Sequence, residues 1–138
     1  MTQEEKQLLL KDLGGRLSCG VIIQVYFEDI SADGYFDEEL WSLELDGESV
    51  HVNDRWIENV KPYLRPMSSM TTEEEYEYHQ CKNIDYLEIC EMEHTEMLKT
   101  TALCFSRATD WLNKKGFDYR GLIPMGLALE APEGMYKS

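Results

Sequence analysis

Two stretches of the chain alternate between apolar and polar residues in the way that β-strands do. In residues 17–28, one face collects four apolar side chains while Gln24 and Tyr26 take the other face. The four apolar residues are Val21, Ile23, Val25 and Phe27. A period of two with one apolar face is typical of a strand that covers a core, so we predict a strand here.

The second stretch surrounds the dipeptide Asp46-Gly47. Alternating residues 40–45 precede it, and alternating residues 48–53 follow it. An Asp-Gly pair at such a junction supplies the positive φ angles of a type I′ turn, which predicts a β-hairpin. The segment Ser31-Ala32-Asp33-Gly34, between the first strand and this hairpin, has the composition of a turn.

The register of the predicted hairpin determines which side chains face the core. A two-residue Asp-Gly turn places Leu43 opposite Val50 and Trp41 opposite Val52, all on one face. His51 then lies on the other face. We therefore expect the tryptophan side of the hairpin to support a helix and His51 to face solvent.

Two helices are predicted from capping residues. Thr2 followed by Glu5 fits a capping box, and Gly14-Gly15 is a stop signal, so the first helix is expected over residues 2–13. A second capping box, formed either by Thr71 with Glu74 or by Thr72 with Glu75, begins a helix that should run to about residue 82. Both capping alternatives stay open at this point.

A third helix is predicted over residues 95–115, with Gly116 as its stop. Its apolar residues recur at helical spacing. They are Met97, Leu98, Ala102, Leu103, Phe105, Ala108, Trp111 and Leu112.

These elements predict a single α+β domain over residues 1–138, a length that fits one domain. A small antiparallel sheet of three to four strands, within residues 17–60, is expected to pack against the helix at 95–115, with the other two helices at its flanks. Pro62 and Pro66 favour an extended segment after a strand near residues 56–60.

The negative charge is concentrated in the middle of the chain. Residues 28–96 contain 20 Asp and Glu against four Lys and Arg, in a chain whose net charge is -14. Such a surface repels phosphate, so direct binding to nucleic acid is not expected. Either the acids only keep the protein in solution, or they form a face that binds a basic protein partner.

Four residues have types and spacing that suit a metal. They are His79, Cys81, Cys90 and His94. Two thiolates and two imidazoles are ligands that tetrahedral zinc prefers, but His79 and Cys81 would splay on a helix, and the spacing differs from the usual zinc-finger pattern. Exposed histidines and buried thiols are the plainer interpretation.

Motifs of catalysis and of cofactor binding are absent from the sequence. It has no phosphate-binding loop, no dinucleotide-binding glycine pattern and no nucleophile elbow. We therefore predict no catalytic residues, no cofactor and no enzymatic activity. We also expect a cytoplasmic protein without a membrane segment, with its four cysteines reduced and Cys104 in the core.

Three segments resemble a set of small uncharacterised proteins encoded by gut Bacteroidetes and by their phages and prophages. The segments are Arg16-Leu-Ser-Cys-Gly-Val21, the stretch 61–75 (KPYLRPMSSMTTEEE) and parts of 110–136 that include FDYRGLI and GLALEAPEGMY. The resemblance implies a cytoplasmic, mobile-element setting and no catalytic activity. A structural role for the shared segments is the alternative interpretation.

Three functional hypotheses follow. The first is a non-catalytic accessory protein of a phage or mobile element that acts by protein-protein binding. The second is an acidic mimic of DNA that inhibits a host nucleic-acid-binding protein. The third is a small module that binds zinc or another ligand.

Overall fold

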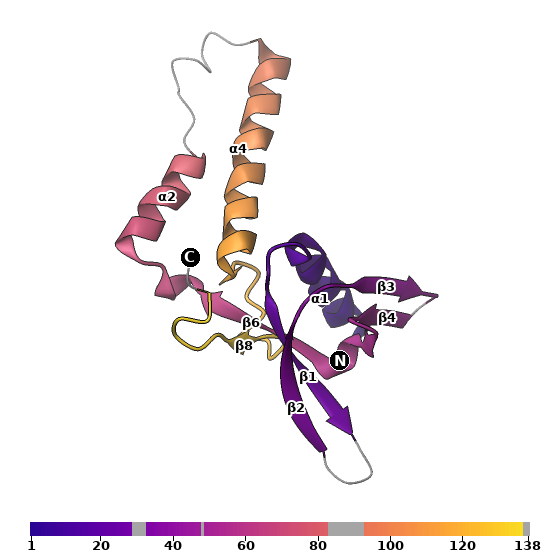
Figure 1. Cartoon of the computed structure of the whole chain (residues 1–138). Helices are drawn as coiled ribbons and strands as arrows, with labels where there is room; N and C mark the ends of the chain where they lie inside the picture. The colour runs from indigo at the N-terminus through magenta and orange to yellow at the C-terminus, as the bar shows by residue number, and fades with distance from the viewer. Residues whose placement is uncertain (29–32, 48, 83–92, 137–138) are drawn as a thin grey trace.

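The computed structural model describes residues 1–28, 33–47, 49–82 and 93–136, and it has the α+β class that the sequence predicts (Figure 1). Its helices are α1 (Gln3–Arg16), α2 (Thr72–Lys82) and α4 (His94–Lys115). Its strands are β1 (Ile22–Glu28), β2 (Asp33–Glu39), β3 (Leu43–Asp46), β4 (Ser49–Val52), β5 (Arg55–Trp56), β6 (Val60–Pro66), β7 (Phe117–Asp118) and β8 (Leu129–Glu130). Short 3₁₀ turns follow β5 and β6.

Strand β6 lies at the centre of the larger sheet. It pairs antiparallel with β1 and parallel with both β7 and β8, so the sheet is mixed rather than purely antiparallel. Residues 61–66 are extended as predicted, but they form a strand inside the sheet. The strand predicted near residues 56–60 was wrong, because β5 ends at Trp56 and Ile57–Asn59 is a 3₁₀ turn. The prolines hid strand β6 because proline cannot donate to a ladder and is mostly confined to sheet edges. The neighbouring strands β7 and β8 are short and need no hydrogen bond from a proline nitrogen. The backbone nitrogen of Arg65 donates to the carbonyl of Gly116, and the carbonyl of Leu64 accepts from the nitrogen of Ala131.

Strand β2 was not predicted, although it pairs with β1 along its whole length. Its sequence begins with Asp33-Gly34 and ends in three acidic residues, a composition that resembles a turn and a solvated loop. Cross-strand ring contacts hold it in place, with Tyr26 and Tyr35 centroids 5.3 Å apart. Residues 31 and 32 of the expected turn lie outside the described residues.

The hairpin exists, but its predicted register was wrong. Strands β3, β4 and β5 form a separate three-stranded sheet in which Leu43 pairs with Val52 and Leu45 pairs with Val50. The turn after Asp46 starts at Gly47, whose φ is 63°. The shift is two residues, so the apolar face is kept and Val52 is fully buried. Trp41 lies before β3 and remains 61% exposed.

A second tight turn, at Asn53-Asp54, joins β4 to β5. Both residues have positive φ, 49° and 64°, as the two central positions of a type I′ turn require. The Asn53 side chain is buried and holds the chain before β3, because its Oδ1 accepts from the backbone nitrogens of Trp41 and Ser42 at 2.7 and 3.0 Å. This turn determines where the second sheet begins.

The core is covered by α1, not by the helix at 95–115 as expected. Leu9 and Leu13 of α1 are fully buried in one cluster with residues of β1, β4 and β6. The helix continues through Gly14-Gly15 to Arg16, so the predicted stop was wrong. Burial of Arg16 among its partners stabilises that last turn, whereas glycine in a helix costs only about 1 kcal/mol.

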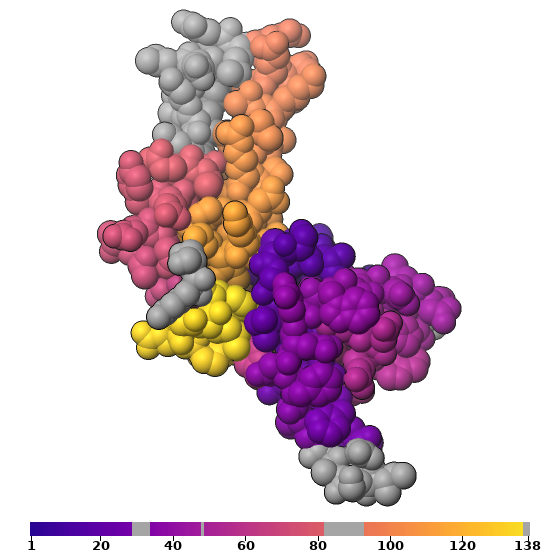
Figure 2. All heavy atoms as spheres, viewed as in Figure 1, coloured from indigo at the N-terminus to yellow at the C-terminus, as the bar shows by residue number. Residues whose placement is uncertain are grey.

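Helices α2 and α4 lie side by side and stand out from the two sheets (Figures 1 and 2). We call this pair the helical arm. Near its foot, helix α4 contacts α1 and β7. It ends as predicted at Gly116, a left-handed residue with φ 80°. No helix in the described part of the chain is both long and apolar enough to cross a membrane.

Candidate protein-binding surface

The foot of the helical arm is fixed to the sheet by a stack of rings and a guanidinium group. Arg65 of β6 lies over the ring of Phe117, with 4.2 Å between its Cζ and the ring centroid. On the helical side, Phe117 stacks nearly parallel on Trp111 of α4 at 5.7 Å, and Trp111 contacts Tyr78 of α2 at 5.8 Å. One continuous stack therefore connects β6, β7, α4 and α2.

Arg65 also stabilises the N-terminus of α2. Its guanidinium binds both carboxylate oxygens of Glu74 at 2.7 Å, and the same carboxylate accepts from the backbone of Thr71. The Arg65 hydrogen bonds hold the pKa of Glu74 at about 2, well below the ordinary 4.5. Of the two capping boxes that the sequence left open, the structure uses Thr71 with Glu74.

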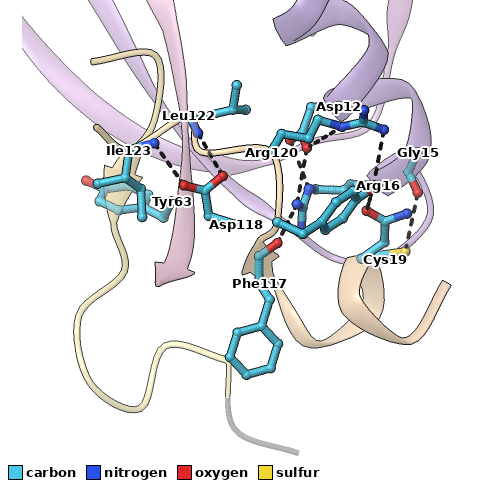
Figure 3. A network of polar contacts seen from close by, with 12 residues as sticks. Asp12, Gly15, Arg16, Cys19, Tyr63, Phe117, Asp118, Arg120, Leu122 and Ile123 are labelled. Carbon is cyan, nitrogen blue, oxygen red and sulfur yellow. Dashed lines mark hydrogen bonds and ion pairs between the residues drawn. The ribbon is translucent and has the colours of Figure 1, made fainter. Parts of the chain in front are cut away.

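A buried ion network fixes α1 to the segment after β7 (Figure 3). Arg16 is fully buried, and its Nε and Nη2 donate to the two oxygens of Asp12 at 2.9 and 3.2 Å. The same Nη2 donates to the carbonyl of Phe117 at 2.5 Å, and Arg120 lies 3.2 Å from Asp12 on the other side. Two arginines share the buried carboxylate of Asp12, although among the described residues Nη1 of Arg16 and Nε of Arg120 have no hydrogen-bond partner. Because these charges are directed at one another inside the protein, we assign the network a structural role.

A neighbouring carboxylate shapes the loop that follows. Both oxygens of Asp118 accept backbone hydrogen bonds, from Leu122 and from Ile123, at 2.9 Å each (Figure 3). The buried carboxylate thus orders the turn that leads to β8. Because each carboxylate oxygen of Asp118 already binds the backbone, we assign this side chain a structural role as well.

A polar cleft of about 610 Å³ lies at the base of α2. Helix α2 lines it with Glu73, Glu74 and Glu77, and the C-terminal segment adds Glu130 and Glu133. Arg65 and Lys115 are the cations on its wall. Because Glu74 is neutralised by Arg65, the remaining carboxylates outnumber Lys115, and the cleft is acidic.

The outer surface of α2 continues this acidic region. Tyr76 is 67% exposed, and the flanking Glu73, Glu75 and Glu77 are exposed too. Glu77 is held in place, since its Oε2 accepts from the indole of Trp111 at 3.3 Å. An exposed tyrosine among carboxylates presents both a π face and negative charge, the two features that attract Arg and Lys side chains.

Several other acidic side chains of the region 28–96 make hydrogen bonds or ion pairs with neighbouring residues of the same chain. Asp37 accepts from the Tyr63 hydroxyl at 2.9 Å, Glu38 accepts from Asn53, and Glu58 pairs with Lys6. Helix α2 also lies on the opposite side of the molecule from the β3–β4 hairpin (Figure 1), whereas the C-terminal end of β2 adjoins the second sheet, where Asn53 donates to Glu38 and to the carbonyl of Glu39. The acidic side chains of α2 therefore form a local surface, and they do not continue into a row of carboxylates across the molecule.

The four residues of the predicted zinc set fall at the outer end of the arm. His79 and Cys81 belong to α2, and His94 is the first residue of α4, while Cys90 lies outside the described residues. His79 and His94 are exposed, and Cys81 is half-buried. Among the residues that the structure describes, no three His, Cys, Asp or Glu side chains form a metal-binding group. The complete set stays a prediction.

The remaining candidate residues have ordinary structural positions. His51, which was expected to face solvent, is half-buried: it pairs with Glu44, and its ring lies tilted against that of Trp56, with 4.7 Å between the ring centroids. Cys104 is buried, as predicted. Within the described ranges, Cys19, Cys81 and Cys104 form no disulfide.

Sequence reasoning missed the residues that build the foot of the arm. Arg65, Trp111 and Phe117 come from different parts of the chain, and nothing in their local sequence shows that they meet. The one available signal was indirect, since all three lie within the segments 61–75 and 110–136 that carry the resemblance described above. Their contacts support the interpretation that those segments are structural.

Comparison with known proteins identifies no relative: no protein-family model, curated protein or solved structure matches the chain.

Proposed function

We propose that this protein is a non-catalytic accessory protein that acts by binding another protein, and that the outer face of α2 with the adjoining acidic cleft is its binding surface. The observation that carries the proposal is the exposed Tyr76 with Glu73 and Glu75 beside it, on an arm whose foot is rigidly stacked against the sheet. A rigid presentation lowers the conformational cost of binding.

The partner is expected to present Lys or Arg side chains. Carboxylates on α2 and in the cleft provide electrostatic attraction, which raises association rates and selects basic surfaces. Tyr76 adds apolar area and a cation-π site at the centre of the patch. The same arrangement gives less support to mimicry of DNA, because that hypothesis needs carboxylates along one continuous face.

The setting of this function is a further part of the proposal. The sequence resemblance supports a cytoplasmic protein encoded by a phage or another mobile element, in which case the partner is a host protein or a protein of the element itself. Enzymatic activity is not proposed, since the polar clusters described above have structural roles.

Affinity capture with matched variants tests the binding surface. The protein is used as bait beside two variants, Glu73→Gln/Glu75→Gln on α2 and Glu39→Gln/Glu44→Gln on β2 and β3. We expect the wild type and the β2–β3 variant to retain the same partner, and the α2 variant to lose it. Capture should weaken as salt rises, because the contact is between exposed charges.

Tyr76→Ala is the second variant of this experiment. It leaves every charge in place and should still reduce capture, which a purely ionic contact would not show. A partner that is retained equally by all variants, or the absence of any partner, contradicts the proposed function.

A further inference from the structure

Strand β2 forms one edge of the larger sheet. It is the last strand in the sheet order, and the β1–β2 pair extends away from the helical arm (Figure 1). All seven of its residues pair with β1 in unbroken register, and none is a proline. At its C-terminal end the side chain of Asn53 donates to the carbonyl of Glu39 at 2.8 Å, so the free part of the edge lies before that residue. A regular edge of this kind can add a further strand, because neither a bulge nor a proline interrupts it.

The main-chain groups of Tyr35 and Asp37 point outwards from this edge. The nitrogen of Leu40 donates to the carbonyl of Val21, so the main chain of Leu40 is directed at the β1 side. In an antiparallel sheet these groups alternate between the two sides of a strand, which turns those of Tyr35 and Asp37 away from β1. Within the described residues no strand pairs with that side of β2. Tyr35 and Asp37 therefore offer their N–H and C=O groups to an added strand.

The charge of the edge determines which strand can add to it. Strand β2 has the sequence DGYFDEE, with four acidic residues and no basic one. Like charges opposite each other on neighbouring strands destabilise their pairing, so a second copy of β2 is disfavoured, whereas Lys and Arg side chains are attracted. Asp37 is exposed, and its Oδ1 accepts from the hydroxyl of Tyr63 at 2.9 Å. Because that hydroxyl is neutral, the hydrogen bond orients the carboxylate without neutralising it.

We propose that β2 binds an extended basic peptide, which adds antiparallel to the sheet as a new edge strand. The peptide main chain bonds to Tyr35 and Asp37, a Lys or Arg lies opposite Asp37, and an aromatic or β-branched residue lies opposite Tyr35. Both side chains are on one face of the sheet, because they are two residues apart. Tyr35 is 65% exposed, and its ring centroid lies 5.3 Å from that of Tyr26, so the edge presents apolar area beside the carboxylate. The inference does not rest on the proposed function, since it concerns the sheet edge and not α2.

Fluorescence anisotropy with labelled synthetic peptides tests the proposal on the full chain. The probe is the heptapeptide Lys-Thr-Lys-Val-Tyr-Thr-Lys, whose third and fifth residues lie opposite Asp37 and Tyr35 in the proposed register. We expect it to bind, with an affinity that falls as salt rises. One control peptide has Glu in place of every Lys, and the other is N-methylated at the third and fifth residues, where the amides face β2. Each control should bind at least about tenfold more weakly, because the first reverses the charge and the second removes two hydrogen bonds.

Variants of the protein locate the site of binding. Tyr35→Pro removes the outward N–H group and leaves the β1 ladder intact, because an edge strand accepts proline where the nitrogen faces outwards. Its matched control is Tyr35→Ala, which removes the same ring and keeps the N–H group. We expect Tyr35→Pro to bind the heptapeptide at least about tenfold more weakly than Tyr35→Ala does. Glu73→Gln/Glu75→Gln on α2 should bind it as the wild type does.

Three results would overturn the proposal. They are equal binding of the N-methylated and unmodified peptides, equal binding by Tyr35→Pro and Tyr35→Ala, and loss of the peptide from the α2 variant alone. Thermal unfolding checks that each variant is folded. Should Tyr35→Pro fail to fold, the N-methylated peptide still decides the question, because it probes the same hydrogen bonds on the wild-type protein.

Discussion

The hydroxyl of Tyr136 lies 2.9 Å from the backbone nitrogen of Ile22, 114 residues away, and 2.5 Å from the carbonyl oxygen of Tyr63. The β1–β6 ladder ends one residue earlier, at the pair Ile23–Pro62. The tyrosine hydroxyl therefore occupies the next rung, accepting from one strand and donating to the other. Burial raises its pKa to about 12, because the charged phenolate is disfavoured there.

Tyr136→Phe should destabilise the fold by about 1–3 kcal/mol, since it leaves two partly buried backbone groups without their partner. Urea unfolding measures the change, with Tyr35→Phe on an exposed ring as the control. The wild type should also lose stability as pH rises from about 10 to about 12, because the folded state holds the phenolic proton more tightly. A Tyr136→Phe variant as stable as the control would contradict the bridging role.

The buried network of α1 gives a prediction about single and double substitutions. Arg16→Met alone should cost about 3–5 kcal/mol, because it leaves the buried carboxylate of Asp12 with only the Arg120 contact. Asp12→Leu/Arg16→Met should cost less than the single change, since both charges are removed together. Within the described residues Nη1 of Arg16 has no hydrogen-bond partner, which adds to the cost of the native pair. Chemical denaturation measures the free energy of unfolding of both variants. A double variant less stable than Arg16→Met would contradict the prediction.

Local signals in the sequence predicted much of the secondary structure. The capping box at Thr2 and Glu5, the apolar face of β1 and the stop at Gly116 all depend on residues a few positions apart, and the structure confirms each. The α+β class followed from the same patterns. Where the signal is local, propensity and capping are sufficient to find an element.

Tertiary contacts determined what the sequence could not show. Strand β6 contains two prolines and is central only because Gly116 and Ala131 come to it from the C-terminal part of the chain. Helix α1 continues beyond Gly14 and Gly15 because Arg16 binds the side chain of Asp12 and the carbonyl of Phe117. The foot of the arm was hidden for the same reason, since Arg65 and Trp111 meet only through Phe117.

The ion pair between Arg65 and Glu74 predicts a dependence on acid. The pKa of Glu74 is about 2 in the folded state and near 4.5 when the chain is unfolded, so its stabilisation is complete above the unfolded value and is lost as pH falls towards 2. Because the pair is partly exposed, we expect a contribution of at most about 1 kcal/mol. Glu74→Gln should flatten this part of the stability-pH profile, whereas Glu75→Gln should not. Identical profiles for the three proteins would exclude the pair as a source of acid sensitivity.

Two glycines at the ends of helices predict opposite effects of the same substitution. Gly116 has φ 80°, and a Cβ there would lie 2.8 Å from Cδ2 of Tyr136, so Gly116→Ala combines backbone strain with a clash against a packed ring. We expect a loss of more than about 1 kcal/mol. Gly14 is helical, with nothing within 4 Å of its added Cβ, so Gly14→Ala should stabilise the protein by up to about 1 kcal/mol. Thermal unfolding of the two variants separates these expectations, because the melting temperature should fall for the first and rise for the second. A rise for Gly116→Ala would mean that the left-handed end of α4 and its contact with Tyr136 do not hold the helical arm in place.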